Sequence, residues 1–277
     1  MMSSRPHKPK PTLTRRRFLK LAAFGLVTTP VSAALLEPRD LEVTRHDAPL
    51  SLLPRDLDGF RIVQLSDLHR CFMTPDSLIR SAVEAANRLS PDVVVVTGDF
   101  VTRDADNAGP CAEMLSRLAP RLGVYAVLGN HDHWTNAAVV RGHIGTHGIR
   151  LLDNACAAVS PGLELIGIDD VWSGSPDFEA AWRSSDPQAA HVFLSHSPVA
   201  VRNAVDKDCL MLAGHTHGGQ VNIPFVPMPP PPGMGGWRYV RGWYNVGRVR
   251  MYVNRGIGHP VRFRCRPEVT LFMLRSA

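Results

Sequence analysis

Five apolar runs in this chain each end in a short group of polar residues, and this repetition constrains the fold more than any other feature. The clearest group is Gly129-Asn130-His131-Asp132, which follows the apolar run Val124–Leu128. The other groups are Asp67-Leu68-His69, Gly98-Asp99, His196 and Gly214-His215-Thr216-His217. A short apolar run predicts a buried strand. We therefore expect the polar groups at strand ends, where they would form a site rather than part of the core.

The stretches between these groups alternate between strand and helix patterns. The β-branched run Val93–Val96 is typical of a strand buried on both faces, and residues 76–89 have apolar positions at helical spacing. We expect further helices at 110–118, 136–146 and 178–183, and further strands at 41–44, 61–66, 149–152, 164–168, 191–195, 209–213, 249–253 and 268–274. This alternation predicts an α/β fold.

A metal site is the chemistry that these polar groups predict. Ligand sites of open α/β sheets form at the carboxyl ends of the strands, so five strand ends would deliver their side chains to one place. In extended backbone, Asp67 with His69 and His215 with His217 would each point to the same side. Imidazole, carboxylate and amide donors without thiolates suit Mn, Fe, Zn or Ni. An isolated histidine is more often a core residue, but burying nine polar residues together without a metal would be very costly.

The five groups, in this order, resemble the motif set of the calcineurin-like metallophosphoesterase superfamily over most of residues 60–275. The stretches Tyr252–Gly258 and Pro267–Thr270 further resemble its bacterial branch of exported or membrane-attached phosphoesterases, the YkuE and YaeI type. The resemblance implies a four-layer α-β-β-α sandwich of two mixed β-sheets flanked by helices. It places the metal site at the C-terminal ends of strands.

The resemblance also implies a role for each residue. It assigns one divalent metal ion to Asp67, His69 and His217, the second to Asn130, His196 and His215, and a position bridging both, along with a hydroxide, to Asp99. Two such ions activate the hydroxide for attack on phosphorus. We expect His131 to protonate the leaving group as general acid and Asp132 to orient it by accepting from its ring N–H. The remaining histidines of the body are expected to be structural or surface residues: His133, His143, His147, His191 and His259.

Substrate contacts are expected from two places. Arg70, next to His69, is either a phosphate contact, because Arg binds oxyanions with two donors, or a solvated loop charge. Residues 222–244 follow the last polar group and combine a stretch rich in proline and glycine, 223–236, with several aromatic residues. They are expected to act as a substrate lid or a membrane-surface contact, or else to be a surface loop packed on the body. The candidate contacts in this stretch are Trp237, Arg238, Arg241 and the aromatic residues Tyr239, Trp243 and Tyr244.

The N-terminus predicts export. Residues 14–20 resemble a twin-arginine signal, and they precede the apolar run Leu21–Val27 and a small-residue cleavage site at 31–33. This run is shorter than the ~20 residues that span a bilayer. We expect a signal peptide over 1–33, an extended lead-in over 34–58 and a single phosphoesterase domain over 59–277. The twin-arginine export machinery is the expected partner, and the periplasm or cell envelope the location, with an uncleaved signal as the alternative that would anchor the protein to the membrane.

Charge and cysteine content exclude two further classes. The first 33 residues hold seven of the 31 basic residues and no acid, so the remainder has 24 basic residues against 25 acids and a net charge of −1. This near-neutral body argues against a nucleic-acid partner. The five cysteines show no C-x-x-C spacing, which argues against a zinc knuckle or a thioredoxin-like site.

The function that these observations favour is hydrolysis of a phosphodiester or pyrophosphate bond on a cell-envelope or lipid-linked substrate. A UDP-2,3-diacylglucosamine-type pyrophosphohydrolase of lipid A synthesis is the alternative. Its UDP-sugar substrate is cytosolic, so this alternative would need an anchor that leaves the domain facing the cytosol. A non-catalytic metal-binding scaffold is the alternative of another class, and the presence of His131 beside a full ligand set argues against it.

Overall fold

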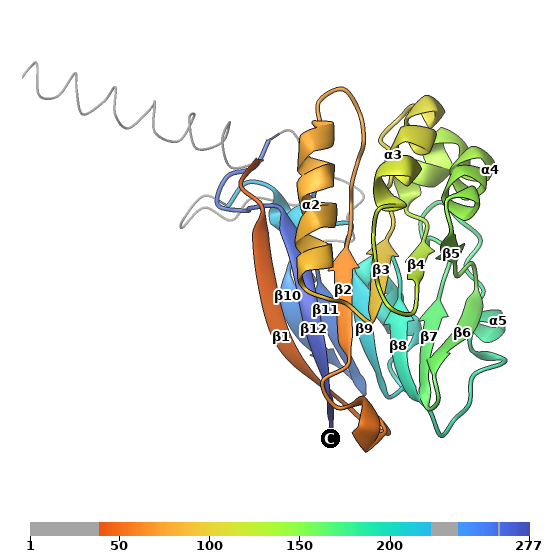
Figure 1. The fold of residues 1–277 in the computed structure, drawn as a ribbon. Coiled ribbons are helices and arrows are strands. Elements are labelled where there is room, and N and C mark those ends of the chain that lie inside the picture. Colours follow the sequence, from red (N-terminus) through yellow and green to blue (C-terminus); the bar gives the residue numbers. More distant parts are fainter. Residues whose placement is uncertain (1–38, 223–237, 260) are drawn as a thin grey trace, which may run out of the picture.

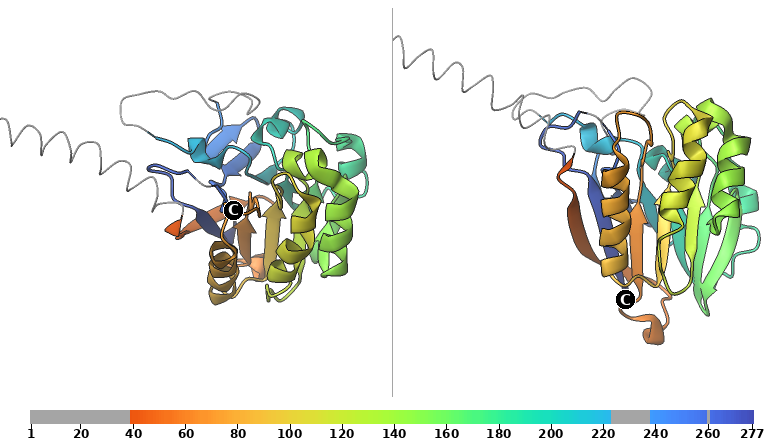
Figure 2. Two further views of the ribbon diagram at one scale, coloured as in Figure 1. Left: turned by 90° about the horizontal axis from the view of Figure 1, so that it is seen from above. Right: turned by 45° about the horizontal axis from the view of Figure 1, so that its top comes forward.

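Two six-stranded β-sheets lie face to face, with helices on their outer faces (Figure 1). The computed structural model describes residues 39–222, 238–259 and 261–277. The predicted signal, the segment 223–236 and Trp237 lie outside the described residues. The view from above separates the helices from the two sheets (Figure 2). The predicted α/β fold with two mixed sheets is confirmed.

The first sheet has the strand order β1-β12-β2-β3-β4-β5. Its strands are β1 (Glu42–Leu50), β2 (Arg61–Leu65), β3 (Val93–Thr97), β4 (Val124–Val127), β5 (Ile149–Leu151) and β12 (Glu268–Ser276). Strands β2 to β5 are parallel, β12 is antiparallel to β2, and β1 is parallel to β12. Therefore β1, which is longer than the strand predicted at 41–44, begins at the edge of the sheet where β2, β3 and β4 end.

The second sheet has the order β10-β11-β9-β8-β7-β6. Its strands are β6 (Ala155–Ser160), β7 (Leu163–Gly167), β8 (Ala190–Leu194), β9 (Cys209–Ala213), β10 (Gly242–Val246) and β11 (Val249–Val253). The four central strands β7, β8, β9 and β11 are parallel, and β6 and β10 are antiparallel edge strands. Neither edge strand was predicted, because β6 is rich in alanine, which is depleted in strands, and β10 contains Gly242 and Asn245, which are also depleted there.

The helices divide unequally between the two outer faces. The first sheet is covered by α2 (Asp76–Arg88), α3 (Ala108–Leu115) and α4 (Asn130–Thr146). The outer face of the second sheet carries only the short α5 (Phe178–Trp182) and the 3-10 helix η4 (Pro198–Asn203) among the described residues. Shorter 3-10 turns are η2 (Arg55–Leu57), η3 (Ala105–Asn107) and η5 (His217–Gly219). The helix predicted from residue 136 begins at Asn130, and the backbone breaks at Asn136, whose φ is −171°.

The core explains the all-valine run in β3. Val94 and Val96 pack toward the helices, whereas Val93 and Val95 pack between the two sheets. Both faces of the strand are dry, so every position favours an apolar, β-branched side chain. Each such burial contributes about 1.5–3 kcal/mol. No helix in the described parts of the chain is long and apolar enough to cross a membrane.

Candidate metal centre

The carboxyl ends of five strands meet at one edge of the two sheets. Strands β2, β3 and β4 end there in the first sheet, and β8 and β9 end there in the second. The seven predicted metal ligands follow these strands and are 0–7% exposed: Asp67, His69, Asp99, Asn130, His196, His215 and His217. The sandwich thus brings together all seven side chains, although they are spread over about 150 residues of sequence.

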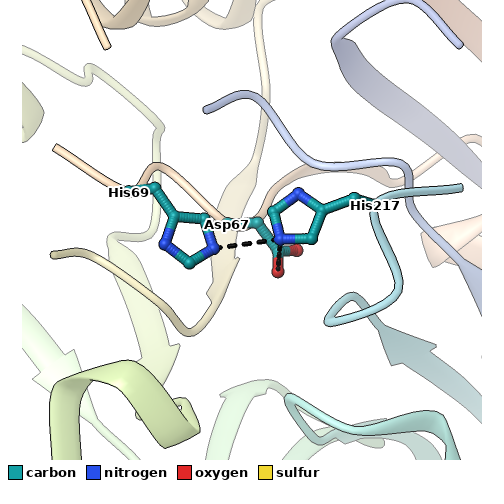
Figure 3. Close-up of side chains that lie close together, drawn as sticks. All are labelled: Asp67, His69 and His217. Atoms are coloured by element: carbon teal, nitrogen blue, oxygen red, sulfur yellow. Dashed lines mark hydrogen bonds and ion pairs between the residues drawn. The ribbon is translucent and has the colours of Figure 1, made fainter. Parts of the chain in front are cut away.

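One group of ligand atoms forms around His69. Its Nε2 lies 3.0 Å from the Nε2 of His217 and 3.3 Å from the Oδ2 of Asp99. The Oδ1 of Asp67 lies 3.6 Å from the Nε2 of His217 (Figure 3). Two atoms that share one metal ion at about 2.1 Å lie about 3.0–3.5 Å apart. The spacing of this group therefore suits a common metal ion.

A second group forms around His196. Its Nε2 lies 3.2 Å from the Oδ2 of Asp99, 3.1 Å from the Oδ1 of Asn130 and 3.1 Å from the Nδ1 of His215. The same oxygen of Asp99 is thus nearly equidistant from the central nitrogens of both groups. This is the position that a carboxylate bridging two ions would need.

Hydrogen bonding shows that a cation fits this centre. The ring of His196 donates its Nδ1–H to the carbonyl oxygen of Thr97 over 2.8 Å, because a carbonyl can only accept. The Nε2 of His196 then faces the oxygens of Asp99 and Asn130, which are also acceptors. One proton on this nitrogen can be donated to only one of the two oxygens. A metal ion would attract the nitrogen and both oxygens. The mixed nitrogen and oxygen donors suit a divalent ion of intermediate hardness.

Electrostatics concentrate negative charge on Asp99. Burial opposes its ionisation, but the neighbouring His196 and His69 outweigh burial and hold the pKa of Asp99 well below its ordinary value. Burial likewise disfavours the charged form of His196, but Asp99 holds its pKa well above the ordinary value. For His217, burial and the charge of His69 both act to lower the pKa. A metal ion would take the place of the proton that these pairs share.

The backbone at the centre adopts a conformation that the sequence pattern did not predict. Asp67, His69, Asp99, His215 and His217 have φ values of 46–72° and make up half of the ten non-glycine residues with positive φ in the described chain. The expectation of extended backbone in the two Asp-x-His and His-x-His pairs is therefore wrong. Left-handed backbone is unfavourable for these residues and persists only where surrounding contacts enforce it. Strain of this kind is typical of functional sites.

Close packing explains the glycine in the Gly98-Asp99 pair. Gly98 has φ of 85°, and a Cβ atom there would lie 2.7 Å from the backbone nitrogen of Gly129 and 2.8 Å from the Nδ1 of His196. Any side chain would push apart β3, β4 and the ring of His196. The glycine thus allows three ligand-bearing segments to approach one another.

His131 lies beside the centre. Its Nδ1–H is donated to the carbonyl oxygen of Thr102 over 2.8 Å, and its backbone N–H is donated to Asp99 Oδ1 over 2.9 Å. A ring nitrogen of His131 lies within 4.8 Å of ligand atoms of His69 and Asp99. Burial lowers the pKa of His131, and the charge of Asp99 only partly offsets this. The bond at Nδ1 thus fixes the ring, and Nε2 is the nitrogen that can take part in a proton transfer.

Asp132 does not make the predicted contact with the ring of His131. Its carboxylate accepts from the backbone N–H groups of Asp99, Phe100, Val101 and Gly129 over 2.9–3.2 Å. It lies in the first turn of α4, where a carboxylate is favoured, while burial, followed by the charge of Asp99, raises its pKa to about 7. The residue that orients His131 is instead Thr102, through its carbonyl oxygen. Asp132 ties the loop after β3 to the start of α4.

The predicted substrate contacts Arg70, Arg238 and Arg241 make contacts with other parts of the chain. The guanidinium of Arg70 donates to Asp76 over 3.1 Å and to Asn107 over 2.5 Å, which holds the loop after His69 against two other segments. Three of its five N–H groups are thus engaged within the fold, because Nη2 also donates to Asp76 over 3.4 Å, so it is not a solvated loop charge. A phosphate contact through its remaining donors stays a prediction. Arg238 and Arg241 are exposed, the former stacked over the ring of Tyr239, the latter donating to the carbonyl oxygen of Arg264.

The aromatic residues of β10 do not belong to a loop over the site. Trp243 packs against His46, Tyr252 and Phe272, with ring centroids 5.1–5.8 Å away. The hydroxyl oxygen of Tyr244 accepts from the backbone N–H of Val240 over 2.9 Å. These two half-buried residues lie in an edge strand of the second sheet and pack on the body, which matches the second alternative rather than a lid or membrane contact.

Four further residues near the centre were not predicted as part of it. The ring of His259 lies 5.2 Å from that of His217, and burial lowers the pKa of His259 to about 4. His133 bonds Asp169 over 2.6 Å and so links α4 to the end of β7. Asp169 and Asp170 follow an apolar strand, like the ligand groups, so that signal was available. His259 had none, because its contact with His217 is purely tertiary.

Comparisons with known proteins agree with this geometry. The sequence model of the calcineurin-like phosphoesterase family matches residues 60–219. The chain is 33% identical to the uncharacterized metallophosphoesterase YkuE of Bacillus subtilis, over 95% of this chain and 98% of that protein. It is 32% identical to the phosphodiesterase YaeI of Escherichia coli, over 95% of this chain and 99% of the relative.

Two further similarities are more distant. The UDP-2,3-diacylglucosamine pyrophosphatase LpxG of Chlamydia trachomatis is 28% identical over 88% of this chain and 92% of its own length. The crystal structure of TT1561 of Thermus thermophilus has a TM-score of 0.50 and 12% identity, covering 72% of this chain and 90% of that one. The latter similarity concerns the fold alone.

Proposed function

Because this chain belongs to the calcineurin-like phosphoesterase family, we propose that it hydrolyses a phosphodiester or pyrophosphate bond with two divalent metal ions, each Mn, Fe, Zn or Ni. The observation that carries the proposal is the position of Asp99. Its Oδ2 lies 3.3 Å from the ligand nitrogen of His69 and 3.2 Å from that of His196, between two groups of donor atoms. A single buried carboxylate between two donor sets is what two neighbouring ions require.

The proposed roles follow the two groups. Asp67, His69 and His217 would hold one ion, Asn130, His196 and His215 would hold the other, and Asp99 would serve both. When bound, two such ions lower the pKa of a water molecule between them and neutralise charge on the phosphate oxygens. The residues around the ligands keep their geometry: Thr97 orients His196, and Asp132 holds the backbone N–H groups that follow Asp99.

We assign the general-acid role to His131. The bond from its Nδ1–H to Thr102 leaves Nε2 as the nitrogen that can give a proton to the departing oxygen. The same ring also lies close enough to Asp99 and His69 to act as a metal ligand. The two roles differ in one measurable way, because loss of a ligand lowers metal content whereas loss of an acid does not.

The proposed substrate is a phosphate ester of the cell envelope, carried on a lipid. The relatives named phosphodiesterase and UDP-2,3-diacylglucosamine pyrophosphatase support this class, and the twin-arginine pattern at 14–20 supports export to the periplasm or cell envelope. A pyrophosphohydrolase acting on a UDP-lipid is the second candidate. Replacing Arg15 and Arg16 with Lys should retain the protein inside the cell, and unchanged export would refute the signal.

The function is tested by measuring metal content and ester hydrolysis together. The purified protein should hold two divalent ions per chain and hydrolyse bis-p-nitrophenyl phosphate. His131→Ala should keep its metal and lose about 10²–10⁴-fold in kcat on an ester with a poor, alkoxide leaving group, and much less on p-nitrophenyl esters, whose leaving group departs without a proton. A fully loaded protein that hydrolyses neither this ester nor p-nitrophenyl phosphate nor a UDP-lipid would refute the enzyme and favour a metal-binding scaffold. Loss of metal in His131→Ala would make it a ligand instead.

A further inference from the structure

Large apolar side chains are exposed around the metal centre. Eight such residues occur in the described chain. Five of them, here called the apolar rim, have exposed fractions of 47–95%: Phe72, Met73, Trp134, Trp172 and Val261. Exposed apolar residues scattered singly need no explanation, whereas a group gathered at one place marks an interaction surface.

Chain position or a contact places each rim residue beside the residues of the centre. Phe72 and Met73 follow His69 in the loop after β2. The ring of Trp134 packs on the ring of His131, with centroids 4.8 Å apart. The indole N–H of Trp172 is donated over 3.0 Å to Ser197, the residue after His196.

The fifth rim residue, Val261, lies next to His259. The ring of His259 donates its Nδ1–H to the carbonyl oxygen of Val261 over 2.9 Å and packs against the ring of His217. The rim therefore includes residues next to both ligand groups. The opposite end of the molecule differs, because there Leu52 and Val205 are exposed singly, at the turn after β1 and before β9.

The course of the chain points to what covers this rim. Strand β1 is antiparallel to β2, so it begins at the edge that carries the metal centre (Figure 1). Glu42, its first residue, pairs with Arg255 over 2.9 Å, and Arg255 packs against Gly218, next to His217. The described chain therefore begins at the end of the molecule that carries the rim, and the apolar run Leu21–Val27 precedes it in the sequence.

Charge near the rim suits anionic headgroups. Arg103 is exposed and follows Thr102, whose carbonyl oxygen holds His131. Arg264 is exposed three residues after Val261. Asp104 beside Arg103 offsets part of this charge, so apolar contact rather than charge is the main attraction.

We propose that the apolar rim docks on the surface of a lipid bilayer and so places the metal centre over phosphate esters of membrane lipids. The proposal rests on the proposed phosphoesterase function for its substrate, but the docking itself is independent of catalysis. Tryptophan and phenylalanine are favoured at the level of lipid headgroups. Phe72, which is 95% exposed, gains most by such burial.

Docking is tested on the full chain with vesicles of phosphatidylethanolamine and phosphatidylglycerol. A photo-crosslinking p-benzoylphenylalanine in place of Phe72 should attach to lipid, and the same probe in place of Leu52 should not. This comparison separates rim contact from tethering by the N-terminal segment, which is common to both proteins. Equal lipid attachment at both positions, no lipid attachment at Phe72, or attachment there to protein instead would overturn the proposal.

A second measurement separates docking from catalysis. Replacing Phe72 and Met73 with Ser should weaken vesicle binding by about tenfold or more, whereas replacing Leu52 and Val205 with Ser should not change it. Both variants should hydrolyse the soluble bis-p-nitrophenyl phosphate like the parent. If the parent fails to hydrolyse any ester, the proposed function fails while the crosslinking still decides the docking. Unchanged vesicle binding by the rim variant would contradict the docking.

Discussion

The chain buries two clusters of charged side chains near the start of β1, and they are built in opposite ways. In one, the carboxylate of Glu268 accepts from Tyr252 over 2.6 Å, from Thr44 over 2.7 Å and from Arg255 over 3.1 Å. Both carboxylate oxygens of Glu268 thus accept hydrogen bonds from donors that the chain supplies. In the other, the carboxylate of Asp99 meets ring nitrogens that it shares with further acceptors.

The difference teaches how to tell a structural ion pair from a site. The Glu268 cluster lies within regular strands β11, β12 and β1 and the residues next to them. The metal centre instead holds its side chains on left-handed backbone at strand ends. Burial alone does not separate the two central carboxylates, because Asp99 and Glu268 are both 1% exposed. The balance between donors and acceptors does separate them. Replacing a member of each cluster should therefore have a different effect.

The largest effect is expected from Asp99→Asn. An amide cannot bridge two cations as a carboxylate does, so metal should be lost and kcat/KM for bis-p-nitrophenyl phosphate should fall by about a thousandfold or more. Elemental analysis and steady-state kinetics measure both. Asp208→Asn, which alters an exposed pair with Arg248, should retain full metal and activity. An Asp99→Asn protein that keeps two ions would break the assignment of the bridging position.

Metal removal should destabilise the parent next most strongly. An ion present at about a thousand times its dissociation constant contributes about 4 kcal/mol, so a chelator should lower the melting temperature by about 8 °C or more. Glu268→Gln should show the same chelator-induced shift, because its cluster holds no metal. Asp99→Asn should show almost none. Calorimetry measures the shift in melting temperature. A parent protein whose melting temperature is unchanged by the chelator would contradict the metal site.

Glu268→Gln should cost about 3 kcal/mol in the free energy of unfolding, with metal content unchanged. Glu268 is 1% exposed, and the substitution leaves the mostly buried guanidinium of Arg255 without its main counter-charge. Urea unfolding measures the loss. The matched surface variant is Asp47→Asn, which disturbs the exposed pair with Arg275 and should leave the free energy of unfolding nearly unchanged. Loss of metal from Glu268→Gln would show that the two clusters are not independent.

The smallest expected effect is a pH dependence of the stability that Glu268→Gln loses. Burial opposes ionisation of Glu268, but Arg255 outweighs it and holds the folded-state pKa below the ordinary value of 4.5. The stabilisation is thus present above the unfolded-state pKa and declines as pH falls through the folded-state pKa. The difference between parent and Glu268→Gln should shrink from about pH 6 to about pH 3. A difference that grows on acidification would refute the ion pair as its source.

Much of this protein was determined by local sequence pattern. Apolar runs followed by polar groups identified β2, β3, β4, β8 and β9 and the residues at their ends, because burial of a parallel strand dictates both its composition and the place where polar side chains become usable. The pattern pointed to nine polar residues at these strand ends, and the family resemblance assigned seven of them as ligands, which the structure brings together.

Only the tertiary structure decided how these residues meet. The left-handed backbone at Asp67 and Asp99, the four N–H donors on Asp132 and the hold of Thr102 on His131 all depend on segments from different strands pressing together. The place of Trp243 in an edge strand likewise depends on pairing with β11. Such contacts join residues far apart in the sequence, and their energies arise only after the sheets have packed, so no local pattern records them.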